Sequence, residues 1–310
     1  MKSFDPSEWD IPASEHWVDI FPITAGWSKD EKYRILHKNG EYFLLRVSAK
    51  EDLANESSLY AALAQLRGRG LNLPDLIGTG LCRQGQNTYR LFSWVDGKEL
   101  SDELPNLSID KQYQLGWQAG ELLRQIHQLP APAGRMPWST YFQQKIDKKL
   151  ALFADCEIDF AGSNHLLQFI DSHRSLVKAR PQCFHHGDYH IGNMLLTPEQ
   201  ELAAIDFNRL DFGDPWDEFN RITWTADKSP AFAAGQINGY FDNHPPPDFF
   251  DLMALYISVN QIGAVPWAAD YGEEEVKTIL EQTKVVMTWF NDFSNTIPNW
   301  YLEPGTANKL

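Results

Sequence analysis

One short segment constrains this chain of 310 residues more than any other. Residues 186–193 read HGDYHIGN, and residues 205–207 read IDF. Between them, the apolar residues 194–196 and 202–205 flank a polar turn, which predicts a hairpin of two short buried strands. The segment is therefore expected to present Asp188 and Asn193 on a loop, and Asp206 at the end of the hairpin.

The spacing of these polar residues favours phosphoryl transfer. That reaction needs a protein that orients an acceptor hydroxyl, holds a metal ion and neutralises charge on phosphates. Asp188 would accept the proton of the hydroxyl. The amide oxygen of Asn193 and the carboxylate of Asp206 would bind Mg²⁺, a hard cation that prefers oxygen ligands. The motif thus predicts an ATP-dependent phosphotransferase that uses Mg²⁺.

Two other interpretations of the same segment stay open. Asp, Gly and Asn all favour turns, so the loop could be structural. Zinc would accept the side chains that crowd here, namely Cys183, His185, His186, Asp188 and His190. Against zinc, the chain has no Cys-x-x-Cys and no His-Glu-x-x-His, and adjacent histidines cannot easily face one ion.

The pattern HGDxHxGN followed by IDF resembles the aminoglycoside phosphotransferase family, whose relatives include choline, fructosamine and macrolide kinases. The resemblance implies an α+β, two-lobed, protein-kinase-like fold. Residues 1–95 would form a small lobe with an antiparallel sheet and one helix, and residues 96–310 a larger, mainly helical lobe. It also implies that Asp188 is the catalytic base and that Asn193 and Asp206 bind magnesium.

The resemblance extends into the first third of the chain. Residues 23–35 read as strand, small-residue turn and strand, where the family places a phosphate-covering loop. Ser28 is the expected phosphate contact, although a plain hairpin explains the same pattern. Residues 41–48 predict a central strand, and Arg46 falls where the family usually carries a phosphate-binding lysine.

A helix is expected at residues 52–66, with Glu56 as the ion-pair partner of Arg46 and Glu51 as a rival. The strand that ends near Asp96 would connect the lobes at about residues 92–97. By resemblance, its backbone would bind adenine. The residues expected to line the base pocket are Phe92, Ser93, Trp94 and Val95.

The rest of the chain is expected to be helical. Apolar periodicity predicts helices at residues 107–129, 138–153, 166–179, 214–226, 231–241, 248–262 and 273–290. Ser163 or Asn164 is the expected cap of the third. Asp214 and Asp217 are expected to hold the catalytic loop and to start the next helix.

The net charge of the chain indicates which binding partners it favours. With 27 basic and 42 acidic residues, the formal net charge is −15, which disfavours nucleic acid and anionic membranes as partners. An acidic surface attracts cations, and in the family acidic walls bind the ammonium groups of aminoglycosides. The corresponding candidates are Asp211, Asp270, Glu273 and Glu274. Acidity can also serve solubility alone.

We therefore expect a kinase that phosphorylates a hydroxyl of a cationic or sugar-like small molecule, such as an antibiotic. Macrolide, choline or homoserine-type acceptors are alternatives. A catalytically weak nucleotide-binding protein of the same fold is another, for which Arg46 is the only support. Three widely spaced cysteines favour a reducing, cytoplasmic setting, and no run of 18 apolar residues predicts a membrane-spanning helix.

Overall fold

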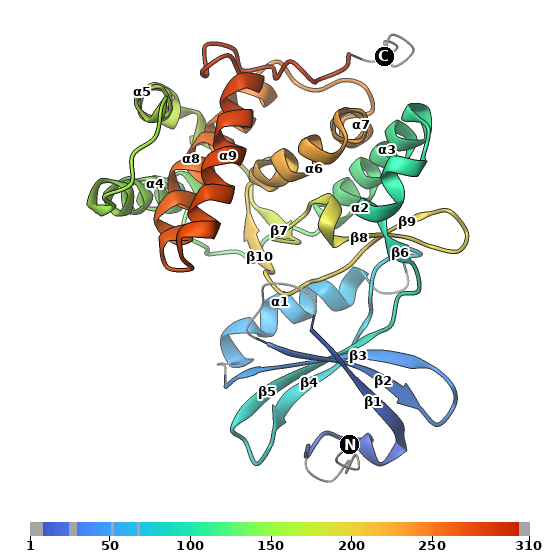
Figure 1. Ribbon diagram of the computed structural model, residues 1–310. Coiled ribbons are helices and arrows are strands. Elements are labelled where there is room, and N and C mark those ends of the chain that lie inside the picture. The colour runs from blue at the N-terminus through green and yellow to red at the C-terminus, as the bar shows by residue number, and fades with distance from the viewer. Residues whose placement is uncertain (1–8, 25–29, 51–52, 67–68, 304–310) are drawn as a thin grey trace. The chain divides into compact units, whose positions relative to one another are not determined.

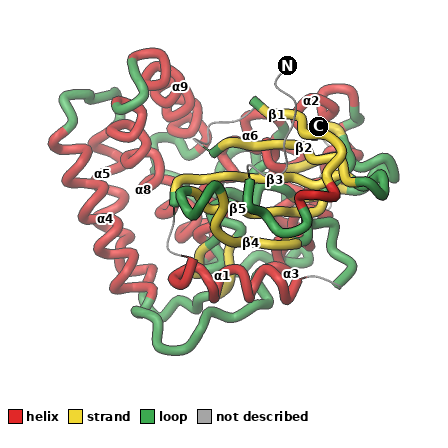
Figure 2. The backbone as a smooth tube through the Cα atoms, turned by 90° about the horizontal axis from the view of Figure 1, so that it is seen from below, coloured by secondary structure: helices red, strands yellow, loops and turns green. Residues whose placement is uncertain are grey.

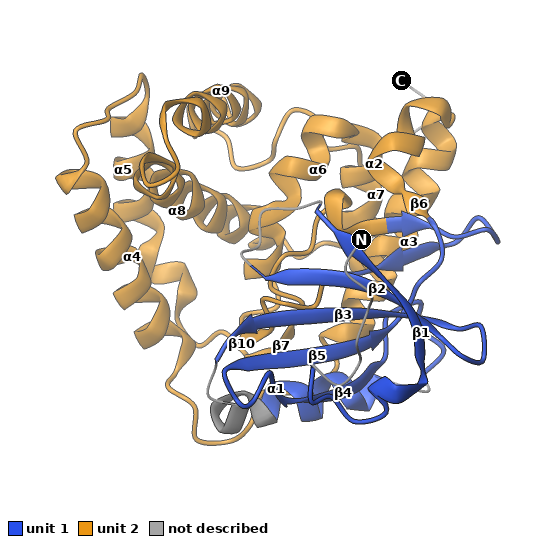
Figure 3. Ribbon diagram, turned by 60° about the horizontal axis from the view of Figure 1, so that its bottom comes forward, with its two compact units in different colours: residues 1–97, 195–205 blue, residues 98–194, 206–310 orange. Residues whose placement is uncertain are grey.

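The computed structural model describes residues 9–24, 30–50, 53–66 and 69–303, without the side chains of residues 53–57. The chain forms two compact units (Figure 3). The first contains residues 1–97 and 195–205, and the second contains residues 98–194 and 206–310. The hairpin at residues 195–205, which the sequence analysis assigned to the second lobe, thus counts with the first unit.

The first unit is built on an antiparallel sheet with the strand order β1-β2-β3-β5-β4 (Figure 2). Its strands are β1 (Trp17–Ile23), β2 (Glu31–His37), β3 (Tyr42–Ala49), β4 (Leu76–Cys82) and β5 (Asn87–Ser93). Helix α1 (Leu53–Leu66) contacts β4, and the hairpin of β8 (Met194–Leu196) and β9 (Leu202–Ala204) follows later in the chain. The predicted small lobe with one helix is confirmed.

Strand β3 is central and is buried on both faces. Leu45 and Val47 join the apolar core of the sheet, while Arg46 and Ser48, on the other face, are 2% and 4% exposed. Successive residues of a strand point to opposite faces, so a strand with no exposed face must be covered on both sides. Arg46 is therefore a buried cation and not a surface residue.

The second unit is mainly helical, as predicted (Figure 1). Its helices are α2 (Leu100–Glu103), α3 (Ile109–Ile126), α4 (Trp138–Asp155), α5 (Ser163–His173), α6 (Ile222–Lys228), α7 (Pro230–Tyr240), α8 (Phe249–Ala269) and α9 (Glu273–Trp289). Strands β7 (Cys183–His185) and β10 (Asp211–Gly213) form a short antiparallel pair. The 3₁₀ helices η5 (Ile191–Asn193) and η6 (Asp217–Arg221) carry residues of the site.

Local chemistry explains where several helices begin. Ser108 caps α3, because its hydroxyl accepts a hydrogen bond from the backbone N–H of Lys111 at 3.3 Å. Ser229 caps α7 in the same way and is followed by Pro230. The expected cap of α5 is wrong: Gly162 precedes this helix in a left-handed conformation, and Ser163 is its first residue.

Helix α8 continues to Ala269, seven residues beyond its predicted end and past the internal Pro266. It is long and apolar enough to cross a membrane by length and composition alone. Two thirds of its apolar window is nevertheless buried inside the protein, which is typical of a core helix.

Helices α3 and α7 lie side by side because glycines remove the side chains between them (Figure 1). A Cβ on Gly116 would lie 2.1 Å from the carbonyl oxygen of Phe232, and one on Gly120 would lie 2.2 Å from that of Gln236. Gly239 meets the backbone of α3 equally closely. The two backbones therefore touch, and any larger residue must push the helices apart.

The variant Gly116→Ala tests this close approach. Alanine favours a helix over glycine by about 1 kcal/mol, but the overpacked contact should cost more and lower the free energy of unfolding by at least about 2 kcal/mol. Urea denaturation of the protein measures it, with a probe in each unit. Gly78→Ala is the control, because its Cβ would make only an ordinary 3.7 Å contact with Tyr89. Equal stability of both variants would contradict the packing argument.

Candidate active site

Asp188 follows β7 on a loop that turns sharply at Gly187. This glycine has a φ of +85°, and a Cβ there would lie 1.7 Å from the carbonyl oxygen of Arg209. Only glycine fits, because the backbone is left-handed and no side chain has room. The rings of His186 and Phe207 pack with centroids 4.4 Å apart. The loop that carries Asp188 therefore lies against the segment that follows β9.

Asn193 is held on the same loop as Asp188. Its side-chain Nδ2 donates a hydrogen bond to the backbone carbonyl of Asp188 at 2.8 Å. This bond fixes the amide and leaves Oδ1 as the atom suited to a hard cation. Asp206 has a φ of +70°, which Asp tolerates better than most residues, and its carbonyl accepts from the N–H of Asn208 at 2.9 Å. The oxygens of Asn193 and Asp206 are of the type that a magnesium ion prefers.

A buried carboxylate, Glu218, holds the loop from beneath. Its oxygens accept hydrogen bonds from the backbone N–H of His186 at 2.8 Å and of Gly187 at 2.7 Å. Its third partner is His127, whose Nε2 lies 3.2 Å away, and Nδ1 of His127 lies 2.9 Å from the hydroxyl of Tyr240. Sequence reasoning missed both Glu218 and His127. No local spacing marks them, because His127 ends a helix far from the motif.

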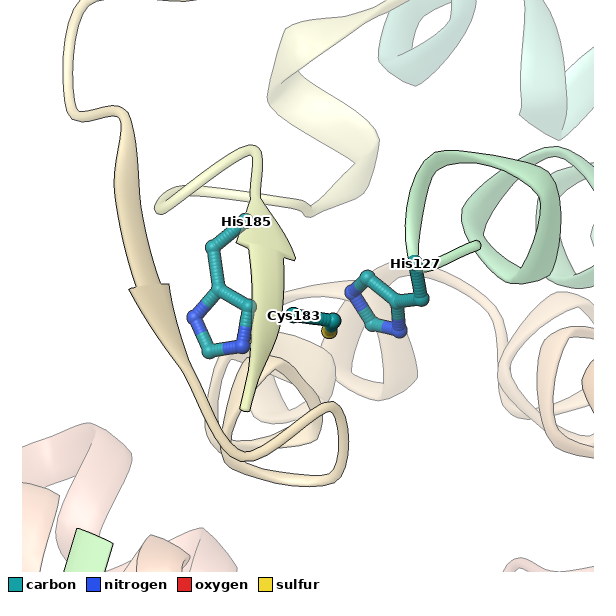
Figure 4. Close-up of side chains that lie close together, drawn as sticks. All are labelled: His127, Cys183 and His185. Carbon is teal, nitrogen blue, oxygen red and sulfur yellow. The ribbon is translucent and has the colours of Figure 1, made fainter. Parts of the chain in front are cut away.

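The side chains that lie close enough to share a metal ion are not the full set considered for zinc from the sequence. Atoms of His127, Cys183 and His185 lie within 4.8 Å of one another, and Figure 4 shows Cys183 between the two rings. Burial raises the pKa of the Cys183 thiol, so it stays neutral. Both nitrogens of His127 already face Glu218 and Tyr240. We therefore assign the cluster to supporting the loop.

Two arginines and a histidine surround the carboxylate of Asp188. Nε of Arg221 lies 3.2 Å from Oδ1, Nε of Arg209 lies 3.9 Å from Oδ2, and Nε2 of His190 lies 3.8 Å from Oδ1. Burial alone would raise the pKa of Asp188, but His190, Arg221 and Arg209 together hold it below its usual value. Asp188 is thus ionised at neutral pH and is a weak base.

Asp214 and Asp217 have supporting partners. Arg180 binds the fully buried Asp214 with two hydrogen bonds, of 2.6 and 3.0 Å, and the hydroxyl of Tyr256 donates a third at 2.6 Å. Asp217 begins η6 and lies 3.4 Å from Nζ of Lys145. Both acids therefore stabilise the segment that leads to Glu218.

In the first unit, Arg46 pairs with Asp30, which the sequence analysis did not consider. Nη2 and Nε of Arg46 lie 2.9 and 3.3 Å from Oδ2 of Asp30. Glu56 lies in α1, but its side chain is outside the described residues, as are Glu51 and Ser28. The Arg46–Glu56 pair and the phosphate contact of Ser28 therefore stay predictions.

The residues predicted to line the base pocket differ in how deeply they are buried. Phe92 is buried in the sheet, whereas Ser93, Trp94 and Val95 line an open hollow of about 340 Å³ in the first unit. The N–H groups of Ser93 and Trp94 already donate to the carbonyls of Asp75 and Tyr42. A backbone donor for adenine would have to come from beyond them in the chain.

The acids expected to bind a cationic acceptor either pair with a cation of the protein or are exposed to solvent. Asp211 lies 3.3 Å from Nη2 of Arg135 and is half exposed. Asp270 follows α8, and Glu273 and Glu274 occupy the first turn of α9, all in solvent. Acids at a helix start are favoured by the backbone dipole whatever the substrate.

The family model described as Phosphotransferase enzyme family, APH, matches residues 19–250. The chain belongs to this family and is a small-molecule phosphotransferase with a protein-kinase-like fold. A search of curated proteins finds no match.

Several solved structures share the fold. A choline/ethanolamine kinase family protein from Mesorhizobium loti is 14% identical with a TM-score of 0.67, covering 93% of this chain and 94% of that one. A thermostable mutant of the aminoglycoside phosphotransferase APH(4)-Ia, complexed with AMP-PNP and hygromycin B, is 16% identical with a TM-score of 0.63, covering 90% and 95%. Amicoumacin kinase hAmiN, with AMP-PNP, Ca²⁺ and Ami, is 13% identical with a TM-score of 0.61, covering 89% and 90%.

The variant Glu218→Gln tests the support of the loop. Burial alone would raise the pKa of Glu218, but His127 and the neighbouring histidines lower it from 4.5 to about 2. A carboxyl with a lowered folded-state pKa stabilises the protein above its unfolded pKa, and this contribution is lost as pH falls from about 4.5 towards 2. Acid titration of the unfolding free energy should therefore be shallower in the variant.

At neutral pH, Glu218→Gln should also destabilise the second unit by about 1–3 kcal/mol, since glutamine offers one acceptor oxygen to two N–H donors. Glu273→Gln, an exposed change in the same unit, is the control. Identical acid profiles for the wild type and Glu218→Gln would overturn the assignment.

Proposed function

We propose that this chain is an ATP-dependent kinase that transfers the γ-phosphate to a hydroxyl group of a small molecule. The observation that carries the proposal is the hydrogen bond that ties Asn193 to Asp188 on a loop anchored by Glu218. The acceptor oxygen bonds to the γ-phosphorus while the bond from that phosphorus to the leaving ADP oxygen breaks. Asp188 orients the hydroxyl and takes its proton.

Magnesium fits the residues present. Oδ1 of Asn193 and the carboxylate of Asp206 would hold it, and when bound it neutralises charge on the β- and γ-phosphates. Because its pKa is low, Asp188 removes the proton late in the reaction, when the oxygen has already begun to bond to phosphorus. Orientation of the hydroxyl is then its larger contribution.

The nucleotide phosphates would be bound by cations of the first unit. Arg46 is paired across the sheet with Lys32 on one side and Arg90 on the other. Directly opposed residues point to the same face of a sheet, so three cations form a row. Asp30 already pairs with Arg46, and a triphosphate would add anionic partners for the row. The N–H groups of Val95 and Asp96 are the proposed adenine donors.

The fold constrains the class of acceptor less than it constrains the reaction. The sequence favours a cationic or sugar-like acceptor, and hygromycin B in the complex of APH(4)-Ia belongs to that class of compound. Macrolide, choline or homoserine-type acceptors, a role in antibiotic resistance and a cytoplasmic location are further proposals. A catalytically weak nucleotide-binding protein is less favoured, because Arg46 keeps a positive charge where the family carries lysine.

The metal assignment predicts a separation of binding from catalysis. Asn193→Ala and Asp206→Ala should each weaken binding of AMP-PNP in Mg²⁺ by at least about tenfold, or about 1.4 kcal/mol. Asp188→Ala should bind AMP-PNP within about threefold of the wild type and yet release no ADP in the presence of any accepted substrate. Isothermal titration calorimetry with and without Mg²⁺ measures the first effect. Magnesium-dependent binding that survives in Asp206→Ala would contradict the assignment.

Arg46 provides a second test, in the first unit. Arg46→Lys should keep the affinity for Mg·AMP-PNP within about tenfold because it keeps the charge, whereas Arg46→Met should lose more than about tenfold. Arg83→Met is the matched control, since Arg83 forms an ion pair with Glu31 on the same sheet and is partly exposed. An affinity loss as large in Arg83→Met would mean that the effect is not local to Arg46.

A further inference from the structure

The side chains nearest to Asp188 have the wrong charge for a cationic acceptor. Arg221, Arg209 and His190 approach its carboxylate from three directions, at 3.2 to 3.9 Å. All lie in the second unit with Asp188, and Arg209 remains about half exposed. An ammonium group brought beside the reacting hydroxyl would meet these cations before any uncompensated acid.

Two lysines of α4 extend this cationic region. Nζ of Lys145 lies 3.4 Å from Oδ2 of Asp217, which begins the same 3₁₀ helix that Arg221 ends. Lys149 lies one helical turn further along α4, so it projects from the same face as Lys145. Its Nζ donates to the carbonyl of Val259 at 3.3 Å.

Lys149 is accommodated by a glycine. A Cβ on Gly263 would lie 2.6 Å from Cδ and 2.9 Å from Nζ of this lysine, so glycine opens the space on α8 that the side chain fills. Burial, followed by the positive charge of Lys145, lowers the pKa of Lys149 to about 7, and Arg221 adds to the effect. Asp217 raises this pKa, but burial and the charges of Lys145 and Arg221 outweigh it.

The charges in this network do not balance. Apart from Asp206, which is assigned to the metal, its carboxylates are Asp188 and Asp217. Its cations are Arg209, Arg221 and Lys145, together with Lys149, which is charged in part, and all come from a chain with a net charge of −15. A base that only removes the proton of a neutral hydroxyl needs no excess of positive charge around it. Positive charge concentrated in an acidic protein points to an anionic ligand.

We propose that the acceptor carries an anionic group, a carboxylate or a phosphate, which Arg221, Lys145 and Lys149 bind next to its reactive hydroxyl. This inference rests on the proposed kinase function and specifies its substrate class. The bound anion would also offset the cations that face Asp188.

Matched pairs of acceptors test the class. Each pair shares its hydroxyls and differs in the anionic group: homoserine and homoserine amide, glycerate and glyceramide, gluconate and gluconamide, glucose 6-phosphate and 6-deoxyglucose. Kanamycin and choline represent cationic acceptors. With Mg·ATP, ADP release should be stimulated by a hydroxy acid or a sugar phosphate, with a KM at least tenfold below that of its neutral partner. Turnover of only neutral or cationic compounds would overturn the inference and leave the kinase function intact.

Variants locate the anion site. Lys145→Met and Lys149→Met should each raise the KM for the accepted anion at least tenfold and leave the KM for Mg·ATP within twofold. Lys148→Met, at the exposed neighbouring position of α4, should change neither. Unchanged acceptor KM values in both lysine variants would remove the proposed site.

A binding measurement makes the test independent of turnover. Inorganic phosphate and malonate are titrated into the protein saturated with Mg·AMP-PNP, so that the nucleotide fills its own phosphate sites. The wild type should bind one of these anions and take up protons at pH 8, because an anion raises the pKa of Lys149 from about 7. Lys149→Met should bind at least tenfold more weakly.

Absence of anion binding to the nucleotide-loaded wild type would overturn the inference. Anion binding that depends on Lys149, in a protein that neither binds Mg·ATP nor releases ADP, would instead overturn the kinase function and keep the anion site.

Discussion

The buried carboxylate of Glu218 is the constraint on which the candidate site depends. The loop that carries Asp188 has little regular structure, so its backbone N–H groups need partners from elsewhere. Glu218 supplies them for His186 and Gly187, and His127, at the end of a separate helix, lies within hydrogen-bond distance of its carboxylate. Removing one member would leave a buried charge or donor without a partner, which costs far more than the net worth of one hydrogen bond. The position of Asp188 is therefore fixed from beneath rather than by its own loop.

The electrostatics of the site then follow from what surrounds that anchored loop. Holding Asp188 among Arg221, Arg209 and His190 keeps it ionised, at the expense of its basicity. Phosphoryl transfer tolerates a weak base because most of its barrier is lowered by positioning and charge neutralisation. The same cations leave the surroundings of Asp188 with a positive surplus that the net charge of the chain conceals. Whole-chain charge thus predicts long-range attraction, while the acceptor meets a local field of the opposite sign.

The sequence predicted the features that depend on local patterns. The family resemblance implied the two-lobed fold, residue type predicted the central strand with Arg46, and apolar periodicity predicted most of the helices. The cap of α5 and the far end of α8 were not predicted. A left-handed Gly162 precedes α5 in place of a capping side chain, and α8 continues past Pro266, where the sequence favours an end. Asp30, Glu218, Lys145 and Lys149 were missed for a related reason. Each acquires its role from a partner distant in the chain, and their spacing alone carries no signal.

Catalysis and acceptor choice are built on different elements, which limits what family membership can reveal. The proposed base and the proposed metal ligands lie on the loop after β7 and at the end of the hairpin, and these segments carry the family motif. The proposed anion site uses α4 and η6, which contain no residue of the motif. At 13–16% identity, the three solved structures share this chain's fold but do not constrain those helices. A change of charge on α4 could therefore redirect the kinase to another class of acceptor and leave Asp188, Asn193 and Asp206 in place.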